Sequence, residues 1–258
     1  MPSILTERDG PVLRLTLNRP EVRNAFDEDL IAALTAAAAE AAEDRTLRAV
    51  VLAGSGKTFC AGADIGWMSK AVAYTQRENL RDAEDVARML ERLDTLPLPV
   101  IARVHGAALG GGVGLAAVCD IVIAAEDTVF ALSEVKLGIL PAVVAPYVLR
   151  KIGVSAAREL FLTGARFTAA RAMAVGLVHE VVPAGELDAA VTRRLAEVVG
   201  AGPKAVGLAK ALIREIAGAN PRDVIGLTTN TLASQRVSDE GQEGLRAFLE
   251  KRKPDWIA

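Results

Sequence analysis

Short apolar segments alternate with helical segments along the first two thirds of the chain, and this alternation restricts the fold more than any other feature of the sequence. Val12–Leu17 alternates apolar and polar side chains with a period of two, which predicts a half-buried strand. Residues 49–52 are continuously apolar and rich in valine, which predicts a buried strand. Further strands are predicted at 99–104, 120–125 and 177–182. Strands that alternate with helices in this way favour an α/β fold.

Helical periodicity fills the intervals between these strands and dominates the end of the chain. Asp27 precedes a predicted helix that runs to about residue 43, since its side chain can accept from the first free backbone N–H groups. A longer helix is predicted at 75–96, and Pro97 and Pro99 end it. From about residue 184 onward the pattern is helical. We therefore expect a core over residues 1–195 and a C-terminal helical region over residues 196–258.

The charge balance and the scarcity of cysteine and histidine exclude several classes of function. The 258 residues carry 30 basic and 32 acidic side chains, a net charge of −2, whereas nucleic-acid binding demands a basic face. Two cysteines, Cys60 and Cys119, are too few for a disulfide framework, and two histidines cannot make a multi-histidine metal site. The N-terminus resembles neither a signal nor a transit peptide, and the longest uncharged apolar run, 106–119, is too short to span a bilayer. We expect a soluble, cytoplasmic protein with no nucleic-acid, membrane or metal partner.

Two glycine-rich turns, at 59–65 and 105–112, each follow a predicted strand. Small residues in such turns let backbone N–H groups point at a closely approaching ligand. Two N–H donors that converge on one point are what a developing oxyanion needs. The alternative is that both segments are ordinary tight turns.

A glutamate, Glu134, lies in an otherwise apolar stretch of the chain, 131–138, where Lys136 is the other charged residue. A glutamate rarely occupies such a place without a partner or a task. Apolar surroundings raise the pKa of a carboxyl group, which suits a proton shuttle near neutral pH.

Two other patterns suggest different chemistry. Residues 112–117 fit the G-x-G-x-x-A form of the dinucleotide fingerprint, but several residues separate them from the strand predicted at 99–104. A nicotinamide-dependent oxidoreductase is therefore an alternative on a weak motif. Cys60 is a possible nucleophile, but neither histidine lies near it in the sequence, so we interpret it as a small residue in a tight loop.

A set of short strings along the chain resembles the crotonase, or enoyl-CoA hydratase/isomerase, superfamily. The resemblance covers nearly the whole chain, and its strings are Asn24-Ala25, Ala61-Gly62-Ala63-Asp64, Gly110-Gly111-Gly112 with Leu115-Ala116 and Cys119-Asp120, and Glu134 with Leu137-Gly138 and Pro141. It implies a spiral of ββα turns, a C-terminal trimerisation or cap region, and a homotrimer or homohexamer. It also implies an acyl-CoA thioester substrate and no cofactor, because coenzyme A is part of the substrate.

The same resemblance implies roles for individual residues. The N–H groups of Ala63 and Gly111 would hold the thioester oxygen as it becomes an enolate, and Glu134 would act as general acid and base. Residues that match segments lining the CoA and acyl groove are Arg23, Ala25, Ala61, Asp64, Ile65 and Met68. Asp64 could instead bond the turn in which it lies. Lys136 is the candidate ligand for a distal substrate carboxylate if the segment is a strand, with Lys70 and Arg77 as alternatives.

One departure from the family pattern narrows the expected activity. Hydratases of this family commonly carry two glutamates, and the place of the first is taken here by Gly114. Finer strings, including 62–68 and 141–147, resemble bacterial methylglutaconyl-CoA hydratases of leucine and acyclic-terpene breakdown, which also have this glycine. We expect interconversion of 3-methylglutaconyl-CoA and 3-hydroxy-3-methylglutaryl-CoA. The alternatives are an enoyl-CoA isomerase, a generic enoyl-CoA hydratase, and a non-catalytic RNA-binding or scaffold protein of the same fold.

Overall fold

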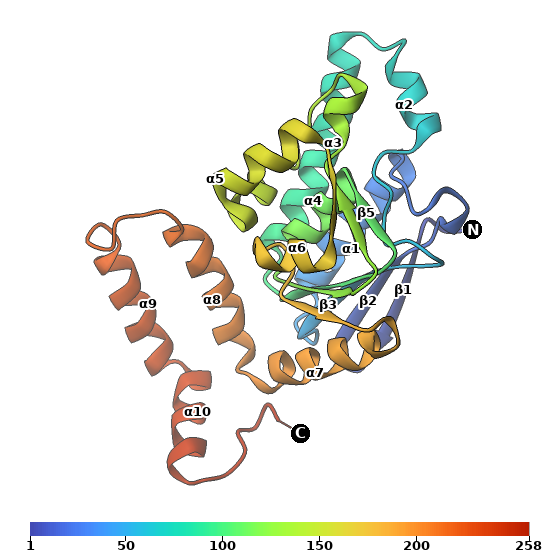
Figure 1. Cartoon of the computed structure of the whole chain (residues 1–258). Helices are drawn as coiled ribbons and strands as arrows, with labels where there is room; N and C mark the ends of the chain where they lie inside the picture. Colours follow the sequence, from blue (N-terminus) through green and yellow to red (C-terminus); the bar gives the residue numbers. More distant parts are fainter. Residues whose placement is uncertain (258) are drawn as a thin grey trace.

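A six-stranded sheet forms the centre of the computed structural model, which describes residues 1–257 (Figure 1). Strand β1 pairs antiparallel with β2, and every other neighbouring pair in this sheet is parallel. The order across the sheet is β1 (Ile4–Asp9), β2 (Val12–Leu17), β3 (Ala49–Gly54), β4 (Val100–Val104), β6 (Ile121–Ala125) and β9 (Glu180–Val182). The predicted strands are confirmed, except that the last begins at Glu180 instead of residue 177.

A second, three-stranded sheet runs beside the first and gives the fold its repeat. It consists of β5 (Ala107–Leu109), β7 (Val129–Ala131) and β8 (Arg166–Thr168), and an isolated bridge adds Cys60 to β5 through Ala108. Twice in succession the chain forms a strand of the large sheet, a strand of the small sheet and then a helix. The helices of these two turns are α4 (Gly111–Val118) and α5 (Ala145–Thr163). The expected spiral of ββα turns is therefore confirmed.

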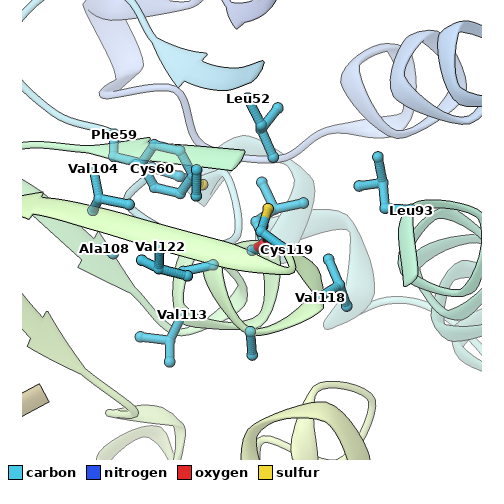
Figure 2. Packing of buried hydrophobic residues seen from close by; sticks show 14 of the residues in the cluster. Leu52, Phe59, Cys60, Leu93, Val104, Ala108, Val113, Val118, Cys119 and Val122 are labelled. Atoms are coloured by element: carbon cyan, nitrogen blue, oxygen red, sulfur yellow. Dashed lines mark hydrogen bonds between the residues drawn. The ribbon is translucent and has the colours of Figure 1, made fainter. Parts of the chain in front are cut away.

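The two faces of the large sheet are covered by different helices. On β3, Val50 and Leu52 pack into a large core with α1 (Glu28–Glu43), α3 (Gln76–Thr95) and α4, part of which Figure 2 shows. Val51, between them, faces a smaller core formed with α7 (Leu187–Gly200). A strand buried on both faces explains the unbroken apolar run at 49–52. Each such side chain contributes about 1.5–3 kcal/mol through burial.

The helices begin where the sequence indicates. The Asp27 side chain accepts from the N–H of Leu30 at the start of α1, as predicted. At the start of α3, Thr75 and Glu78 form a reciprocal capping box. The remaining short elements are the helices α2 (Ile65–Ala71) and α6 (Ala169–Ala174), and the 3-10 turns Pro20–Val22, Glu134–Leu137 and Ala184–Glu186.

The C-terminal helices extend from the core as a separate layer, drawn orange to red in Figure 1. They are α8 (Pro203–Ile216), α9 (Ile225–Val237) and α10 (Asp239–Leu249). Lys210 attaches α8 to the core, because its Nζ lies 2.7 Å from Oδ2 of Asp120 and 3.0 Å from the carbonyl oxygen of Leu98. The predicted boundary between residues 195 and 196 falls inside α7, whose last fully buried residue is Leu195. In the described residues, every helix is too short or too polar to cross a bilayer.

Strand β5 also changes the interpretation of the dinucleotide-like motif. The predicted gap before this motif contains a strand, and α4 begins at Gly111 only two residues after that strand ends. The motif therefore lies closer to the preceding strand than predicted, so this separation no longer counts against a dinucleotide site. The function of the turn must be inferred from the residues around it.

Candidate active site

The first glycine-rich turn is held by backbone hydrogen bonds on both sides. On one side, Cys60 donates to the carbonyl of Ala107 at 3.1 Å and accepts from the N–H of Leu109 at 2.9 Å. On the other side, Phe26 donates to the carbonyl of Gly62 at 2.7 Å and accepts from the N–H of Asp64 at 2.8 Å. The turn is therefore fixed between β5 and the segment that leads into α1.

These bonds determine the direction of the Ala63 amide. The Gly62 carbonyl points at Phe26, and in a trans peptide the next N–H points the opposite way. The Ala63 N–H therefore points away from Phe26, and no residue in the described part of the chain accepts from it. Gly62 has a φ of +91°, and a β-carbon there would lie 2.8 Å from the carbonyl oxygen of Leu109, so a side chain would not fit.

The second turn presents an amide in the same way. Gly110 has a φ of +50°, and its carbonyl accepts from Val113 at 2.9 Å and Gly114 at 3.2 Å, so it points along α4. The N–H of Gly111 must then point out of the N-terminus of that helix, where the helix dipole favours negative charge. Within residues 1–257 this N–H has no acceptor either.

Glu134 lies against the second turn. It begins the 3-10 turn that follows β7, and its Oε1 lies 3.0 Å from the position that a β-carbon on Gly110 would occupy. Its Oε2 is buried and has no hydrogen-bond partner among the described residues. Burial raises the pKa of Glu134 above its ordinary value, which confirms the direction expected from the sequence. A buried carboxylate oxygen without a partner is well suited to bind a substrate or a water molecule.

One cavity of about 600 Å³ brings these groups together. Ala63, Gly111 and Glu134 all line it, as does Met68, and its walls are otherwise mostly apolar. Among the described residues that line it, Glu134 and Asp82 are the only ones with a charged side chain. A second hollow of about 420 Å³ lies between α1 and α3 and shares Trp67 and Asp82 with this cavity. An apolar cavity with few polar groups is typical of a small-molecule site.

The other predicted groove residues lie outside the lining of the cavity. Ala25 is buried, and the N–H of Ala61 donates to the carbonyl of Arg23 at 3.0 Å, so Arg23 and Ala61 support the first turn through their backbone. The Arg23 side chain and Ile65 are exposed beside that turn. Asp64 accepts from the N–H groups of Gly66 and Trp67 at the start of α2, the structural role that the sequence left open.

Lys136 lies on a 3-10 turn, not on a strand, so it does not share a face with Glu134. Its side chain is exposed and packs close to Gly164, at the end of α5. The structure therefore does not bring it to the cavity. The rival candidates Lys70 and Arg77 are also exposed, and Lys70 pairs with Glu28 at 2.8 Å.

The space that a side chain at position 114 would need is already occupied. Gly114 is buried in α4, and a β-carbon there would lie 2.2 Å from Cγ1 of Val144.

Cys60 is fully buried, and burial raises the pKa of its thiol to about 12, which supports its interpretation as a packed residue. Within the described chain, no three or more His, Cys, Asp or Glu side chains are grouped to hold a metal ion.

Sequence reasoning missed several residues of the cavity on α3. Asn79, Asp82, Ala83 and Val86 all line it. Their spacing of three, four and seven residues places them on one helix face. The sequence predicted this helix, but none of these four residues was assigned to a site.

The chain is similar to known proteins over nearly its whole length. A family model described as enoyl-CoA hydratase/isomerase matches residues 7–258. A putative enoyl-CoA hydratase of Thermus thermophilus is 36% identical, covering 95% of this chain and 97% of its own. The 2,3-dehydroadipyl-CoA hydratase of Escherichia coli is 33% identical, covering 99% of each chain. The crystal structure of an enoyl-CoA hydratase from Shewanella pealeana superposes with a TM-score of 0.95 at 38% identity, covering 98% of this chain and 96% of that one.

Proposed function

The chain belongs to the enoyl-CoA hydratase/isomerase family, and we propose that it adds water reversibly across the C2–C3 double bond of an enoyl-CoA thioester. Hydratases of this kind are hydro-lyases, and this chain is an enzyme of that type. One observation carries the proposal: a half-buried glutamate with a buried, unpartnered carboxylate oxygen and two backbone amides without acceptors, at Glu134, Ala63 and Gly111, line the same cavity.

The proposed mechanism uses these three groups. The thioester oxygen accepts hydrogen bonds from the amides of Ala63 and Gly111, which lowers the barrier to enolate formation. The Glu134 carboxylate removes a proton from a water molecule, whose oxygen forms a bond to C3 while the double-bond electrons move toward the thioester. The protonated Glu134 then delivers its proton to C2, which restores the thioester and the carboxylate. In the reverse direction Glu134 removes the C2 proton and protonates the departing C3 hydroxyl group.

A single carboxylate suffices if its two oxygens serve the two carbons, and Val144 leaves no room for a second one at position 114. The same observation favours a second candidate, an enoyl-CoA isomerase. Such an enzyme moves a proton between C2 and C4 with one base and adds no water. The product separates the two, because only hydration places a hydroxyl group on C3.

For the acyl group we propose 3-methylglutaconyl-CoA, with 3-hydroxy-3-methylglutaryl-CoA as the hydrated partner. Leu140, Val143 and Val144, which line the same cavity as Glu134, are apolar side chains that suit a methyl branch at C3. The name of the Escherichia coli relative indicates an acyl chain with a distal carboxylate in this family. The described lining offers no cation for that carboxylate, so it must extend toward the surface. Arg77 is a candidate there, because it lines a shallow hollow that shares Asn79 with the cavity.

A panel of CoA esters tests the proposed activity. The panel contains 3-methylglutaconyl-CoA, crotonyl-CoA and a 3-enoyl-CoA, each incubated in heavy water and followed by absorbance and mass spectrometry. We expect a product with a C3 hydroxyl group and deuterium at C2, formed fastest from 3-methylglutaconyl-CoA. Preference for crotonyl-CoA would overturn the choice of acyl group. Conversion of the 3-enoyl ester alone, to a product that has not gained water, would identify an isomerase.

We also propose that the chain forms a homotrimer or homohexamer. The C-terminal helices expose large apolar side chains: Ile213, Leu232, Val237 and Phe248 are 67%, 53%, 77% and 81% exposed. Apolar surface of this kind is typical of an interface between subunits. Light scattering on the eluted protein measures the mass directly. A monomer at micromolar concentration would overturn the proposal.

A further inference from the structure

Arg19 connects three acceptors from different parts of the first turn and its surroundings. Its Nη2 lies 2.8 Å from Oδ2 of Asp27 and 3.1 Å from Oδ2 of Asp64, and its Nη1 donates to the carbonyl of Ala25 at 2.6 Å. The three charged side chains are 18%, 19% and 13% exposed, so water screens them less than it screens a surface pair. No local pattern in the sequence points to Arg19.

Each of the two carboxylates begins a helix. Asp27 accepts from the N–H of Leu30 at 2.9 Å, and Asp64 accepts from the N–H of Gly66 at 2.7 Å. Desolvation raises the pKa of Asp64, but the backbone donors and the Arg19 guanidinium outweigh it and hold this pKa below its ordinary value. One nitrogen of Arg19 therefore joins the starts of α1 and α2, while a second nitrogen of the same planar guanidinium holds the Ala25 carbonyl, a forked geometry that a single ammonium nitrogen does not offer.

Ala63 lies between Gly62, whose carbonyl accepts from Phe26, and Asp64, whose carboxylate accepts from Arg19. Its N–H direction follows from the Gly62 carbonyl, which accepts from Phe26, and Asp64 is the next residue along the chain. We infer that Arg19 is a positioning residue for the proposed oxyanion hole: by holding the Asp64 carboxylate against Asp27 and Ala25, it keeps the Ala63 amide aimed into the cavity. This inference rests on the proposed function.

Loss of the guanidinium would act on the turn in a definite way. Asp27 and Asp64 share one nitrogen of Arg19, so without it two carboxylates would face each other with no cation between them. Like charges repel, and the short link from Asp64 to Ala63 would transmit the shift to the amide. A misaligned donor weakens binding of the transition state more than binding of the substrate. A positioning error of about 1 Å can cost about 10²-fold in rate.

A spectroscopic experiment tests this effect on the amide itself. Cinnamoyl-CoA, a conjugated thioester, absorbs at longer wavelength when hydrogen bonds polarise its carbonyl group. The spectrum of the bound ligand is recorded in the Glu134→Gln background, which slows turnover by at least about 10²-fold, with and without Arg19→Gln. Arg171→Gln is the matched control, because Arg171 pairs with Glu159 in an exposed ion pair on the surface. Steady-state kcat and KM are measured in the parent chain with the same Arg19 and Arg171 substitutions.

We expect a red shift in the Glu134→Gln protein and in the Arg171→Gln control, and a smaller shift with Arg19→Gln at unchanged affinity. We also expect kcat to fall by about 10- to 100-fold with little change in KM. An undiminished shift and kcat in Arg19→Gln would overturn the inference but not the proposed function. No red shift in any variant would overturn the proposed oxyanion hole, and the inference with it.

Arg19→Lys keeps the test decisive if Arg19→Gln does not fold. Lysine retains the charge but cannot bond both carboxylates and the Ala25 carbonyl in the planar geometry of arginine. We expect a red shift between those of the parent and Arg19→Gln, and a correspondingly smaller loss of kcat. A full shift with normal kcat in a folded Arg19→Lys protein would overturn the inference.

Discussion

Val144 occupies the space into which a side chain at position 114 would project. A β-carbon built on Gly114 would lie 2.2 Å from Cγ1 and 2.9 Å from Cβ of Val144, far inside van der Waals contact. Gly114 lies within α4 and Val144 immediately precedes α5, so this contact joins two helices of the core. The absence of a glutamate at position 114 is therefore built into the packing of the fold.

The first prediction concerns this contact. Gly114→Ala should destabilise the protein by about 1–3 kcal/mol, because an added methyl group must displace Val144 in a closely packed core. The free energy of unfolding is measured by urea denaturation. Val144→Ala in the same chain should recover part of the loss, so that the double variant is more stable than the two single losses predict. Strict additivity would show that the two residues do not compete for this space.

The second prediction concerns Glu134 as the proposed general acid and base. Glu134→Gln keeps the shape of the side chain but removes the base, and we expect kcat to fall by at least about 10²-fold. Binding of a CoA ester, measured by calorimetry, should be largely retained. Glu159→Gln is the control, because Glu159 is an exposed residue of an ion pair on α5. Near-normal turnover in Glu134→Gln would remove this residue from the mechanism.

The third prediction follows from the raised pKa of Glu134. Hydration needs the carboxylate form, so the acidic limb of the kcat/KM profile should lie above pH 4.5, the ordinary value for this side chain. The folded state favours the protonated form, so the stability from this group is fully present below the ordinary pKa and is lost as pH rises through the raised one. Glu134→Gln should therefore be more stable than the parent at neutral pH.

That difference in stability should shrink as the pH falls through the raised pKa toward 4.5, and it should be smallest below 4.5, where both folded and unfolded parent chains carry a protonated Glu134. Unfolding curves for the two proteins at matched pH values measure the difference. A stability gap that does not change with pH would mean that the Glu134 carboxyl group titrates alike in both states.

The fourth prediction concerns Trp67, which lines both the cavity and the hollow between α1 and α3. Trp67→Ala should connect the two spaces and admit longer acyl chains. The ratio of kcat/KM for a twelve-carbon enoyl-CoA to that for crotonyl-CoA should rise by about tenfold or more. Met68→Ala is the comparison, because Met68 lines the cavity but not the hollow. An equal change of the ratio in both variants would mean that Trp67 does not separate the two spaces.

Much of the fold could be predicted from local patterns. Side-chain alternation located β2, the continuous apolar run located β3, and Asp27 marked the start of α1. The three-residue strands β5, β7 and β8 were not predicted, because a segment so short has no periodicity of its own, and β9, which is equally short, was predicted only with a start three residues too early. They exist because neighbouring segments of the spiral pair with them.

The residues of the candidate site also fall into those that local patterns indicate and those that they do not. An acidic residue in apolar surroundings and two glycine-rich turns are local features, and they located Glu134 and the two turns, whereas the choice of the Ala63 and Gly111 amides within these turns came from the family resemblance. Arg19 and Val144 act through residues 45 and 30 positions away in the sequence, Asp64 and Gly114, and no local pattern pairs them. Lys136 shows the converse error, because its proximity to Glu134 in the sequence did not place it in the cavity.

The donors at positions 63 and 111 belong to the polypeptide backbone, not to side chains, and this has a consequence for how the site can change. No codon change other than one to proline can delete such a donor, because every other residue carries the same N–H group. Inherited variation can reach the proposed oxyanion hole only by altering its shape, through the small residues that the turns require and the side chains that brace them. Replacement of one amide by an ester through chemical synthesis would be the direct way to remove it.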